Sequence, residues 1–259
     1  MILFRLARLL LHLAAGLLTC ALVFPRANPA ERNAHIHRWS LKLLALCRVR
    51  LEVVGEVPRA SHALVVANHI SWLDIFVINA VQPHRFVAKS DIRDWPVIGW
   101  LCDKAGTIFI ARGRVRDVRR IYEGLVEKLQ AGEHVAFFPE GTTAKQGAVL
   151  PFHANLFEAA IEAKLPVQPF ALRYVDGEGR LHPAADFAGE TTLVQSVWYI
   201  LGARDMRVQL IPLPLLDTAH EPHRRELAAA ARASIVAALG EALDEDAAAG
   251  TPVMRESGT

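Results

Sequence analysis

A histidine and an aspartate near each other in the sequence could form a proton-transfer pair. His69 follows the apolar run Ala63–Ala67 and Asn68, and Asp74 comes five residues later. In one regular helix, five residues at about 100° each would place the two side chains about 140° apart. They can therefore meet only if His69 precedes a helix and Asp74 lies in its first turn. Asp74 would then accept a hydrogen bond from one ring nitrogen and leave the other free to act as a base.

The same residues also have a purely structural interpretation. Ser71 is a candidate N-cap for a helix over residues 72–81, which places Asp74 at the third helical position. A serine followed three residues later by an acidic residue is typical of a capping box, and an acid in the first turn stabilises a helix without any catalysis. The spacing alone leaves both interpretations open.

Three further segments carry polar residues at the ends of apolar strands or within them. They are GTIFIAR at Gly106–Arg112, FFPEGTT at Phe137–Thr143 and LPVQPF at Leu165–Phe170. We expect their polar ends to gather at one edge of a sheet, where ligands of parallel sheets bind. A guanidinium can bind phosphate through two parallel hydrogen bonds, and a glycine turn lets backbone N–H groups approach an anion. Each segment alone also fits a structural role: Arg112 as a surface charge, Glu140-Gly141 as a turn, and Thr142 and Thr143 as helix caps.

Strands and helices alternate along the chain beyond residue 50. This order predicts an α/β fold with a mostly parallel central sheet flanked by helices. Pro166 and Pro169 in the predicted strand 165–175 suggest that this strand lies at an edge of the sheet or is irregular. The predicted strands are 50–55, 63–68, 84–89, 107–111, 134–139, 165–175 and 207–215, and the predicted helices are 72–81, 95–105, 114–130, 152–163, 191–202 and 224–243.

The first 50 residues form a separate, membrane-associating helical segment in this prediction. The chain up to Phe24 is nearly all apolar, broken by Arg5, Arg8 and His12. Its uninterrupted part, Leu13–Phe24, is shorter than the roughly 20 residues that span a bilayer. We expect a retained anchor in one leaflet, with a full span and a cleaved signal peptide as alternatives. If the segment spans, its arginines favour a cytoplasmic N-terminus.

A second helix in this segment, His37–Arg50, has Trp39, Leu43 and Leu46 at helical spacing among basic residues. It fits either a helix packed on the core or one at the membrane interface, and the preceding apolar stretch favours the membrane. The domain itself is expected to cover 51–243. The polar tail 244–259 is expected to be disordered.

Composition narrows the classes of function. The 259 residues are 52% hydrophobic with mean hydropathy +0.22, which leans towards membrane association. The net charge of +2 is too small to indicate a nucleic-acid partner, and the five arginines in 111–120 fit a solvated face, an anionic membrane or the phosphates of coenzyme A. Cys20, Cys47 and Cys102 are far apart, which indicates reduced thiols in the cytoplasm. No metal-ligand spacing is present, and His62, His84, His134 and His153 are expected to be surface or packing residues.

Taken together, the four segments resemble the glycerolipid acyltransferase family, of the 1-acylglycerol-3-phosphate acyltransferase type. Its N-H-x4-D motif matches Asn68-His69 to Asp74, and its G-x-I-F-I-x-R motif matches Gly106–Arg112. Its F-P-E-G-T motif matches Phe138–Thr142, and a V-P-V-x-P-like strand matches Leu165–Pro169. The motifs occur in the family's order, and the likeness extends from about residue 53 to about residue 213.

The resemblance implies transfer of a fatty acyl group from acyl-CoA or acyl carrier protein to the hydroxyl of a lysophospholipid, without a bound cofactor. It implies that His69 is the general base and that Asp74 orients it. It assigns Arg112, Glu140, Gly141 and Thr142 to the acceptor's polar head, and Lys89 of FVAKSDI matches a family lysine that could bind phosphate. The absence of a G-x-S-x-G elbow agrees with direct attack on the thioester.

One departure bears on the acceptor. Many family members have Glu-Gly-Thr-Arg, with the arginine thought to bind phosphate, and this chain has Thr143 in that place. The default acceptor is 1-acyl-sn-glycerol-3-phosphate, giving phosphatidic acid, and a lyso-ornithine lipid or another lysolipid is the alternative. A non-catalytic lipid-binding protein of the same fold is a third hypothesis. The expected location is the cytoplasmic face of the inner membrane.

Overall fold

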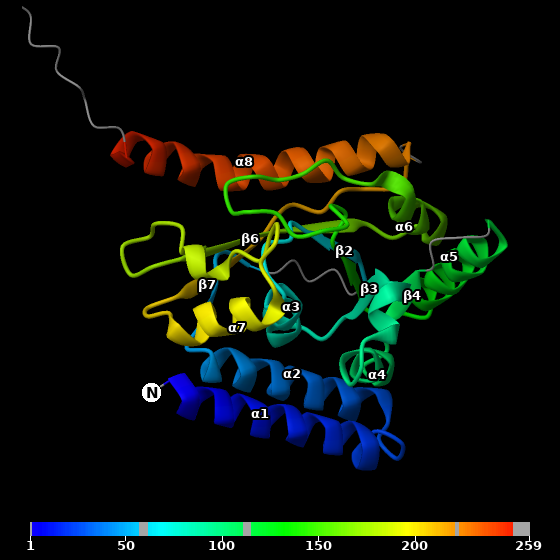
Figure 1. The fold of residues 1–259 in the computed structure, drawn as a ribbon. Helices are drawn as coiled ribbons and strands as arrows, with labels where there is room; N and C mark the ends of the chain where they lie inside the picture. Colours follow the sequence, from blue (N-terminus) through cyan, green and yellow to red (C-terminus); the bar gives the residue numbers. More distant parts are fainter. Residues whose placement is uncertain (1, 57–61, 111–114, 221–222, 251–259) are drawn as a thin grey trace, which may run out of the picture.

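A seven-stranded sheet runs through the middle of the molecule, with helices on both of its faces (Figure 1). The computed structural model describes residues 2–56, 62–110, 115–220 and 223–250. Across the sheet the strands lie in the order β1, β7, β6, β2, β5, β3, β4. Their bounds are β1 Arg50–Val53, β2 Leu64–Ala67, β3 Arg85–Lys89, β4 Ile108–Ile110, β5 Val135–Phe137, β6 Val167–Val175 and β7 Arg207–Pro212.

The prediction of a mostly parallel sheet is confirmed. The five neighbouring strands from β6 to β4 are all parallel to one another, and only the step from β6 to β7 is antiparallel. All four residues of β2 are buried, as expected for a strand covered on both faces. The parallel direction places the carboxyl ends of β2, β3, β4 and β5 at one edge of the sheet, where the chain continues into three of the polar segments.

The helices form two layers on opposite sides of the sheet (Figure 1). One side carries α3 (Asp74–Val81), α7 (Leu193–Gly202), α2 (Pro29–Leu46) and, outermost, α1 (Ile2–Leu18). The other side carries α5 (Val115–Gln130), α6 (Glu158–Ala163) and α8 (Arg224–Gly250). Each layer buries its own apolar cluster against the sheet, so the sheet is the wall between two hydrophobic cores.

Several helix boundaries differ from the prediction. The expected helix 95–105 is shorter, α4 at Ile98–Lys104, and a 3₁₀ turn at Ser90–Asp94 precedes it. The expected helix 152–163 begins as a 3₁₀ turn at Ala154–Phe157 before α6. α8 extends to Gly250, so part of the tail that was expected to be disordered is helical, and 251–259 lie outside the described residues.

The interpretation of 165–175 as an edge strand is wrong, because β6 lies between β7 and β2. Proline is tolerated there because Pro169 lies where the β6–β7 ladder ends. Its carbonyl accepts a hydrogen bond from the Leu213 N–H at 3.0 Å, and the side-chain amide of Gln168 donates to the Leu213 carbonyl at 2.6 Å. The side chain thus supplies the donor that the proline lacks.

α1 packs on the molecule along one stripe and is exposed along the rest. It continues as a π-helical segment, Thr19–Val23, and the stripe that faces inward is Leu9, His12, Gly16 and Cys20. The outward side exposes large apolar residues: Leu3, Phe4, Leu10, Leu11, Leu18 and Leu22. By length and composition, Ile2–Val23 is the one candidate membrane span among the described residues.

A histidine–tryptophan pair joins α1 to α2. The rings of His12 and Trp39 stack with centroids 4.5 Å apart, and each side chain hydrogen-bonds the other residue's carbonyl, at 3.0 and 3.2 Å. The close approach depends on Gly16, because a Cβ there would lie 2.7 Å from the Trp39 ring nitrogen. Both helices are therefore held by a contact that admits no side chain at position 16.

We predict opposite effects for two helical glycines. Gly16→Ala should lower the thermal unfolding midpoint, because displacing Trp39 costs about 1–3 kcal/mol, more than the helix propensity that alanine adds. Gly124→Ala in α5 should raise the midpoint, since a Cβ there meets no atom within 4 Å and alanine adds up to about 1 kcal/mol of helix propensity. Thermal unfolding of both variants in the same detergent checks this; a Gly16→Ala variant as stable as Gly124→Ala would contradict it.

Candidate active site

The site begins where β2 ends, at Asn68. This side chain is buried, and its amide pairs with the backbone of Leu172 in β6: the NH₂ donates to the Leu172 carbonyl at 2.9 Å and the oxygen accepts from the Leu172 N–H at 2.8 Å. The side chain thereby continues the β2–β6 ladder by one step after the β2 backbone has turned away. Asn68 fixes the point from which His69 leaves the sheet.

His69 and Asp74 make the contact that their spacing predicted. His69 Nδ1 lies 2.8 Å from Asp74 Oδ2, and the Asp74 side chain is fully buried. The same oxygen accepts the backbone N–H groups of Ile70 at 2.7 Å and Ser71 at 2.9 Å. The other oxygen, Oδ1, accepts the Tyr174 hydroxyl at 2.7 Å. Four donors therefore surround one carboxylate, which compensates for its removal from water.

The geometry fixes the roles of the two ring nitrogens of His69. Because Asp74 Oδ2 is an acceptor, Nδ1 must carry the hydrogen, which leaves the lone pair on Nε2. Within the described part of the chain Nε2 makes no hydrogen bond, and 18% of the side chain is exposed. The ring stacks on Phe138 with centroids 3.9 Å apart and planes within 7°. The Phe138 ring thus fixes the plane of the imidazole, Asp74 holds its Nδ1, and the basic Nε2 remains available.

The prediction that Ser71 caps α3 is wrong. α3 begins at Asp74, two residues later than expected, and its N-cap position is Leu73, which makes no side-chain cap bond. Residues 71–74 form a turn closed by the Asp74 N–H on the Ser71 carbonyl at 3.1 Å. Ser71 Oγ accepts the Leu73 N–H in a long contact of 3.4 Å, and Asp74 Oδ2 accepts the Ser71 N–H at 2.9 Å, so the serine and the aspartate close the turn that precedes α3.

Glu140 holds the backbone of His69 in place. Its Oε1 accepts the His69 N–H at 2.7 Å, and its Oε2 accepts the Leu150 N–H at 2.8 Å. The His69 carbonyl in turn accepts the Ala144 N–H at 2.8 Å. Burial raises the pKa of Glu140, and its two backbone hydrogen bonds oppose that rise. The loop after β5 therefore hydrogen-bonds both the backbone N–H and the backbone carbonyl of His69.

The rest of this loop lies at the surface beside the site. Gly141 has φ of +67°, a conformation that favours glycine, and a Cβ there would lie 3.3 Å from the His153 ring. Thr142 is exposed. Thr143, at the position where the resembling family often has arginine, donates its hydroxyl to the Phe187 carbonyl. Its side chain is therefore used within the protein.

The other predicted site residues are Lys89, Arg112 and the segment Leu165–Phe170. Lys89 is exposed at the end of β3, in register with Ile110 of β4, and Arg112 lies outside the described residues. The segment Leu165–Phe170 does not reach the site as expected. It leads into the amino end of β6, where Pro169 lies opposite Val66 of β2. Val66 comes before Asn68 in the chain and His69 comes after it, so this segment lies beside β2 and not beside the histidine.

Sequence reasoning missed Tyr174 and treated Phe138 only as part of a motif. Tyr174 is a polar side chain in an apolar strand, 100 residues from Asp74, so no local spacing relates the two. Burial and the neighbouring Asp74 charge raise the pKa of Tyr174 well above its usual range. The hydroxyl therefore stays protonated and remains a donor to Asp74 throughout the physiological pH range.

A buried carboxylate behind a partly exposed histidine, at the carboxyl edge of a parallel sheet, defines an α/β enzyme with a candidate general base. A family model described as Acyltransferase matches residues 48–173. A 1-acyl-sn-glycerol-3-phosphate acyltransferase of Neisseria meningitidis is 36% identical over 83% of this chain and 85% of its own length. A lyso-ornithine lipid O-acyltransferase of Pseudomonas aeruginosa is 39% identical, covering 82% and 85%.

The chain therefore belongs to the acyltransferase family, as its motifs suggested. A solved structure has the same fold: the 1-acyl-sn-glycerophosphate acyltransferase PlsC of Thermotoga maritima. It superposes with a TM-score of 0.63 at 22% identity, over 93% of this chain and 97% of that one.

Tyr174→Phe should slow acyl transfer by about 10-fold and leave KM for both substrates nearly unchanged. Removing the hydroxyl leaves Asp74 Oδ1 buried without a donor, so the carboxylate is held less firmly behind His69. Steady-state kinetics with the folded variant check this. A matched control is Tyr199→Phe on the exposed side of α7, which should keep the parent kcat. Equal kcat for both variants would show that Tyr174 does not position Asp74.

Glu140→Gln should lower the free energy of unfolding by about 1–3 kcal/mol and lower kcat. A glutamine has one acceptor oxygen, so its NH₂ group would face a backbone N–H of either His69 or Leu150, donor against donor. Denaturant unfolding and kinetics check the two effects together. A variant with parent stability and kcat but a raised KM for the acceptor would instead identify Glu140 as a substrate contact.

Proposed function

We propose that this protein moves a fatty acyl group from acyl-CoA or acyl carrier protein to the free hydroxyl of a lysophospholipid. The default acceptor is 1-acyl-sn-glycerol-3-phosphate, and the product is then phosphatidic acid. The observation that carries the proposal is the His69–Asp74 contact, which leaves Nε2 as an uncommitted base at the sheet edge. The names of relatives that are 36–39% identical support this type of acceptor.

The proposed reaction is a single displacement. Nε2 of His69 removes the proton from the acceptor hydroxyl as its oxygen attacks the thioester carbonyl. The tetrahedral intermediate collapses, the C–S bond breaks, and the imidazolium returns the proton to the leaving thiolate. Asp74 stabilises the imidazolium and holds the tautomer, in the role that an aspartate has in a serine–histidine–aspartate triad. The products are the ester and the free thiol of the donor.

We propose that the acceptor's polar head lies over the ends of β3, β4 and β5. Lys89 and Arg112 are proposed to supply positive charge for a phosphate, and the exposed Thr142 a hydroxyl. Glu140 and Gly141 are proposed to contribute through the shape of the loop, since both carboxylate oxygens of Glu140 already accept backbone N–H groups.

A lyso-ornithine lipid is the second candidate acceptor, favoured by Thr143. Thr143 stands where many members of the resembling family have an arginine that can bind an anion. Its hydroxyl donates to the Phe187 carbonyl, and it adds no positive charge to the head-group region. Lyso-ornithine lipid O-acyltransferases of Pseudomonas aeruginosa and Rhodobacter capsulatus are 39% and 34% identical to this chain. An acceptor with its own amino group has less need of such a charge than a phosphomonoester.

We propose that the protein works from the cytoplasmic face of a membrane, with α1 lying in one leaflet. The inward stripe of α1 packs on the molecule while its outward side is apolar, an arrangement that suits a helix lying in the interface. Free Cys20, Cys47 and Cys102 fit a reducing compartment.

The deciding experiment is thiol release by the full-length protein with acyl-CoA or acyl carrier protein and a panel of lysolipids. Release with 1-acyl-sn-glycerol-3-phosphate supports the default acceptor. Release with lyso-ornithine lipid alone would replace it with the second candidate. No release with any acceptor and either donor would favour the non-catalytic lipid binder.

His69→Ala should lower kcat at least about 10²–10⁴-fold, the contribution typical of a general base. The fold should persist, because Asp74 keeps its hydrogen bonds from Ile70, Ser71 and Tyr174. Circular dichroism and thiol release on the same sample check both statements. Residual activity within 10-fold of the parent enzyme would remove His69 from the role of base.

Asp74→Asn should keep the fold and slow turnover by about 10²–10⁴-fold, because the imidazolium loses its counter-charge. The asparagine oxygen can still accept from Ile70 and Ser71, while its NH₂ can donate to the Tyr174 oxygen. Kinetics and thermal unfolding check the separation of the two effects. A parent-like rate would leave Asp74 with a structural role alone.

A further inference from the structure

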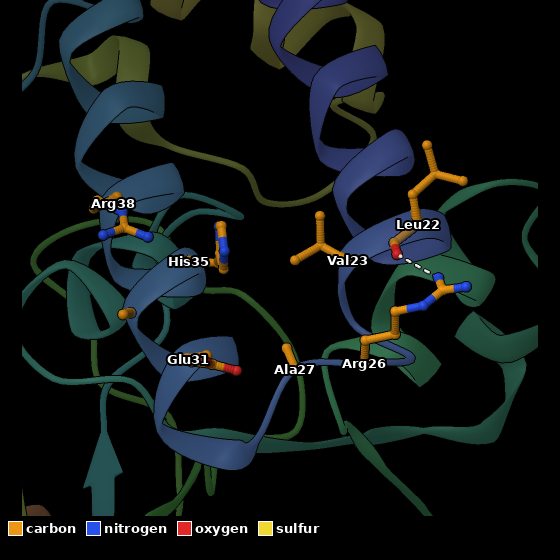
Figure 2. A pocket seen from close by; sticks show the side chains of 8 residues that line it. Leu22, Val23, Arg26, Ala27, Glu31, His35 and Arg38 are labelled. Carbon is orange, nitrogen blue, oxygen red and sulfur yellow. Dashed lines mark hydrogen bonds between the residues drawn. The ribbon is translucent and has the colours of Figure 1, made fainter.

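The turn that joins α1 to α2 lies in the outermost layer of the molecule (Figure 1), and side chains around it line a basic hollow (Figure 2). It has a volume of about 470 Å³ and opens to solvent. Leu22, Val23, Arg26 and Ala27 line it from the end of the first helix and the turn, and Glu31, Ala34, His35 and Arg38 line it from α2. In Figure 2, His35 and Val23 point toward each other across the hollow.

The α2 side of the hollow is one helical stripe. Glu31, Ala34, His35 and Arg38 recur at spacings of three, one and three residues, which places them along one face of the helix. The small side chain of Ala34 leaves the middle of that stripe open. Phe24 is buried beneath the turn, and its ring lies 6.3 Å from that of His35. One wall of the hollow is therefore a regular helix face, and a buried aromatic ring supports the turn beneath it.

The charges in the hollow favour an anion. Arg26 and Arg38 are exposed, and neither takes part in an ion pair found among the described residues. Arg26 makes one long contact, at 3.5 Å, to the Leu22 carbonyl. The one acidic lining residue, Glu31, already accepts the Asn28 N–H at 2.8 Å in a capping box. The His35 imidazole and the Arg38 guanidinium thus remain for a ligand, and the exposed Arg26 guanidinium, which lies beside Leu22 and away from His35 in Figure 2, would join them by rotation of its side chain.

The surroundings of the hollow indicate where such an anion would come from. The outward side of the first helix carries exposed Leu18, Leu22 and Val23 directly before the turn. Trp95, which precedes α4, and Trp100 within α4 are also exposed, and α4 lies beside the same end of the α1–α2 layer (Figure 1). Exposed apolar and tryptophan side chains next to unpaired arginines are the pattern of a surface at the level of lipid head groups.

We propose that this hollow binds the phosphate of an anionic membrane phospholipid between Arg26, His35 and Arg38. The lipid's acyl chains would extend along the apolar side of α1, while the phosphate receives hydrogen bonds from the guanidinium groups. The inference rests on the proposed membrane attachment and adds head-group selectivity to it. The ligand is a lipid of the bilayer, bound in a layer of the molecule separate from the sheet edge that carries His69.

The test is flotation of the full-length protein with phosphatidylcholine vesicles, with and without phosphatidylglycerol. Arg26→Gln/Arg38→Gln should weaken binding to the phosphatidylglycerol vesicles about 30-fold, which is about 2 kcal/mol for two guanidinium groups that hydrogen-bond the phosphate directly. Its binding to pure phosphatidylcholine should be unchanged. Ala34→Trp, which fills the hollow and keeps every charge, should cause a similar loss on the anionic vesicles alone.

The matched control is Arg8→Gln/Lys42→Gln, which removes two exposed charges from the same helices outside the hollow. It should weaken anionic binding by no more than a few-fold. Equal losses for the two double variants, with no loss for Ala34→Trp, would show a diffuse electrostatic attraction and overturn the proposal. Release of the parent protein from the vesicles by inorganic phosphate, but not by the same ionic strength of chloride, would identify a free-phosphate site instead.

Acyl transfer in detergent micelles keeps this inference separate from the proposed function. All three variants should keep parent activity there within about two-fold, because none of the changed residues lies in the site of His69. Parent activity in micelles combined with parent-like flotation of Arg26→Gln/Arg38→Gln would reject the lipid site and leave the function intact. An inactive parent protein that still selects anionic vesicles through the hollow would reject the function and leave the lipid site intact.

Discussion

The site depends on one buried carboxylate and the donors that surround it. A buried ionised carboxylate is costly unless every oxygen is hydrogen-bonded. Asp74 meets that requirement with two backbone N–H groups, one phenol and the histidine ring. Because the first three donors belong to the fold itself, the carboxylate is fixed before any substrate arrives. His69 is then oriented by a group that has no freedom to move.

β6 is the strand that gives this arrangement its rigidity. Its residue Leu172 pairs with Asn68, and its residue Tyr174 donates to Asp74, so both sides of the His69 turn are fastened to the same strand. The loop after β5 adds the third constraint, with Glu140 and Ala144 on the backbone of His69. Both neighbours of β2 in the sheet, β6 and β5, thus contribute restraints on the histidine. Parallel order makes this possible, since it brings the following loops to one edge.

The outer layer of helices serves a different purpose from the sheet edge. α1 and α2 are joined by a tight contact at Gly16 and by paired hydrogen bonds between His12 and Trp39. That contact holds the apolar outer side of α1 on the molecule in a defined orientation. In the proposed function a lipid acceptor reaches His69 from a bilayer, and a rigid pair of helices beside the sheet would then limit how the site faces the membrane. The basic hollow at the turn, as the proposed lipid site, would add a second restraint on that orientation.

The sequence alone determined the class of fold, most strands and helices, and the contact between His69 and Asp74, because periodicity and short-range spacing are local properties. It also gave the family through four ordered motifs. Tertiary structure decided the rest: the central place of β6, the distance of Leu165–Phe170 from the site, and the roles of Tyr174 and Glu140. These depend on which strands become neighbours and on which buried N–H groups find an acceptor. Neither is encoded within a few residues, since Glu140 lies 71 residues from His69 and Tyr174 lies 100 residues from Asp74.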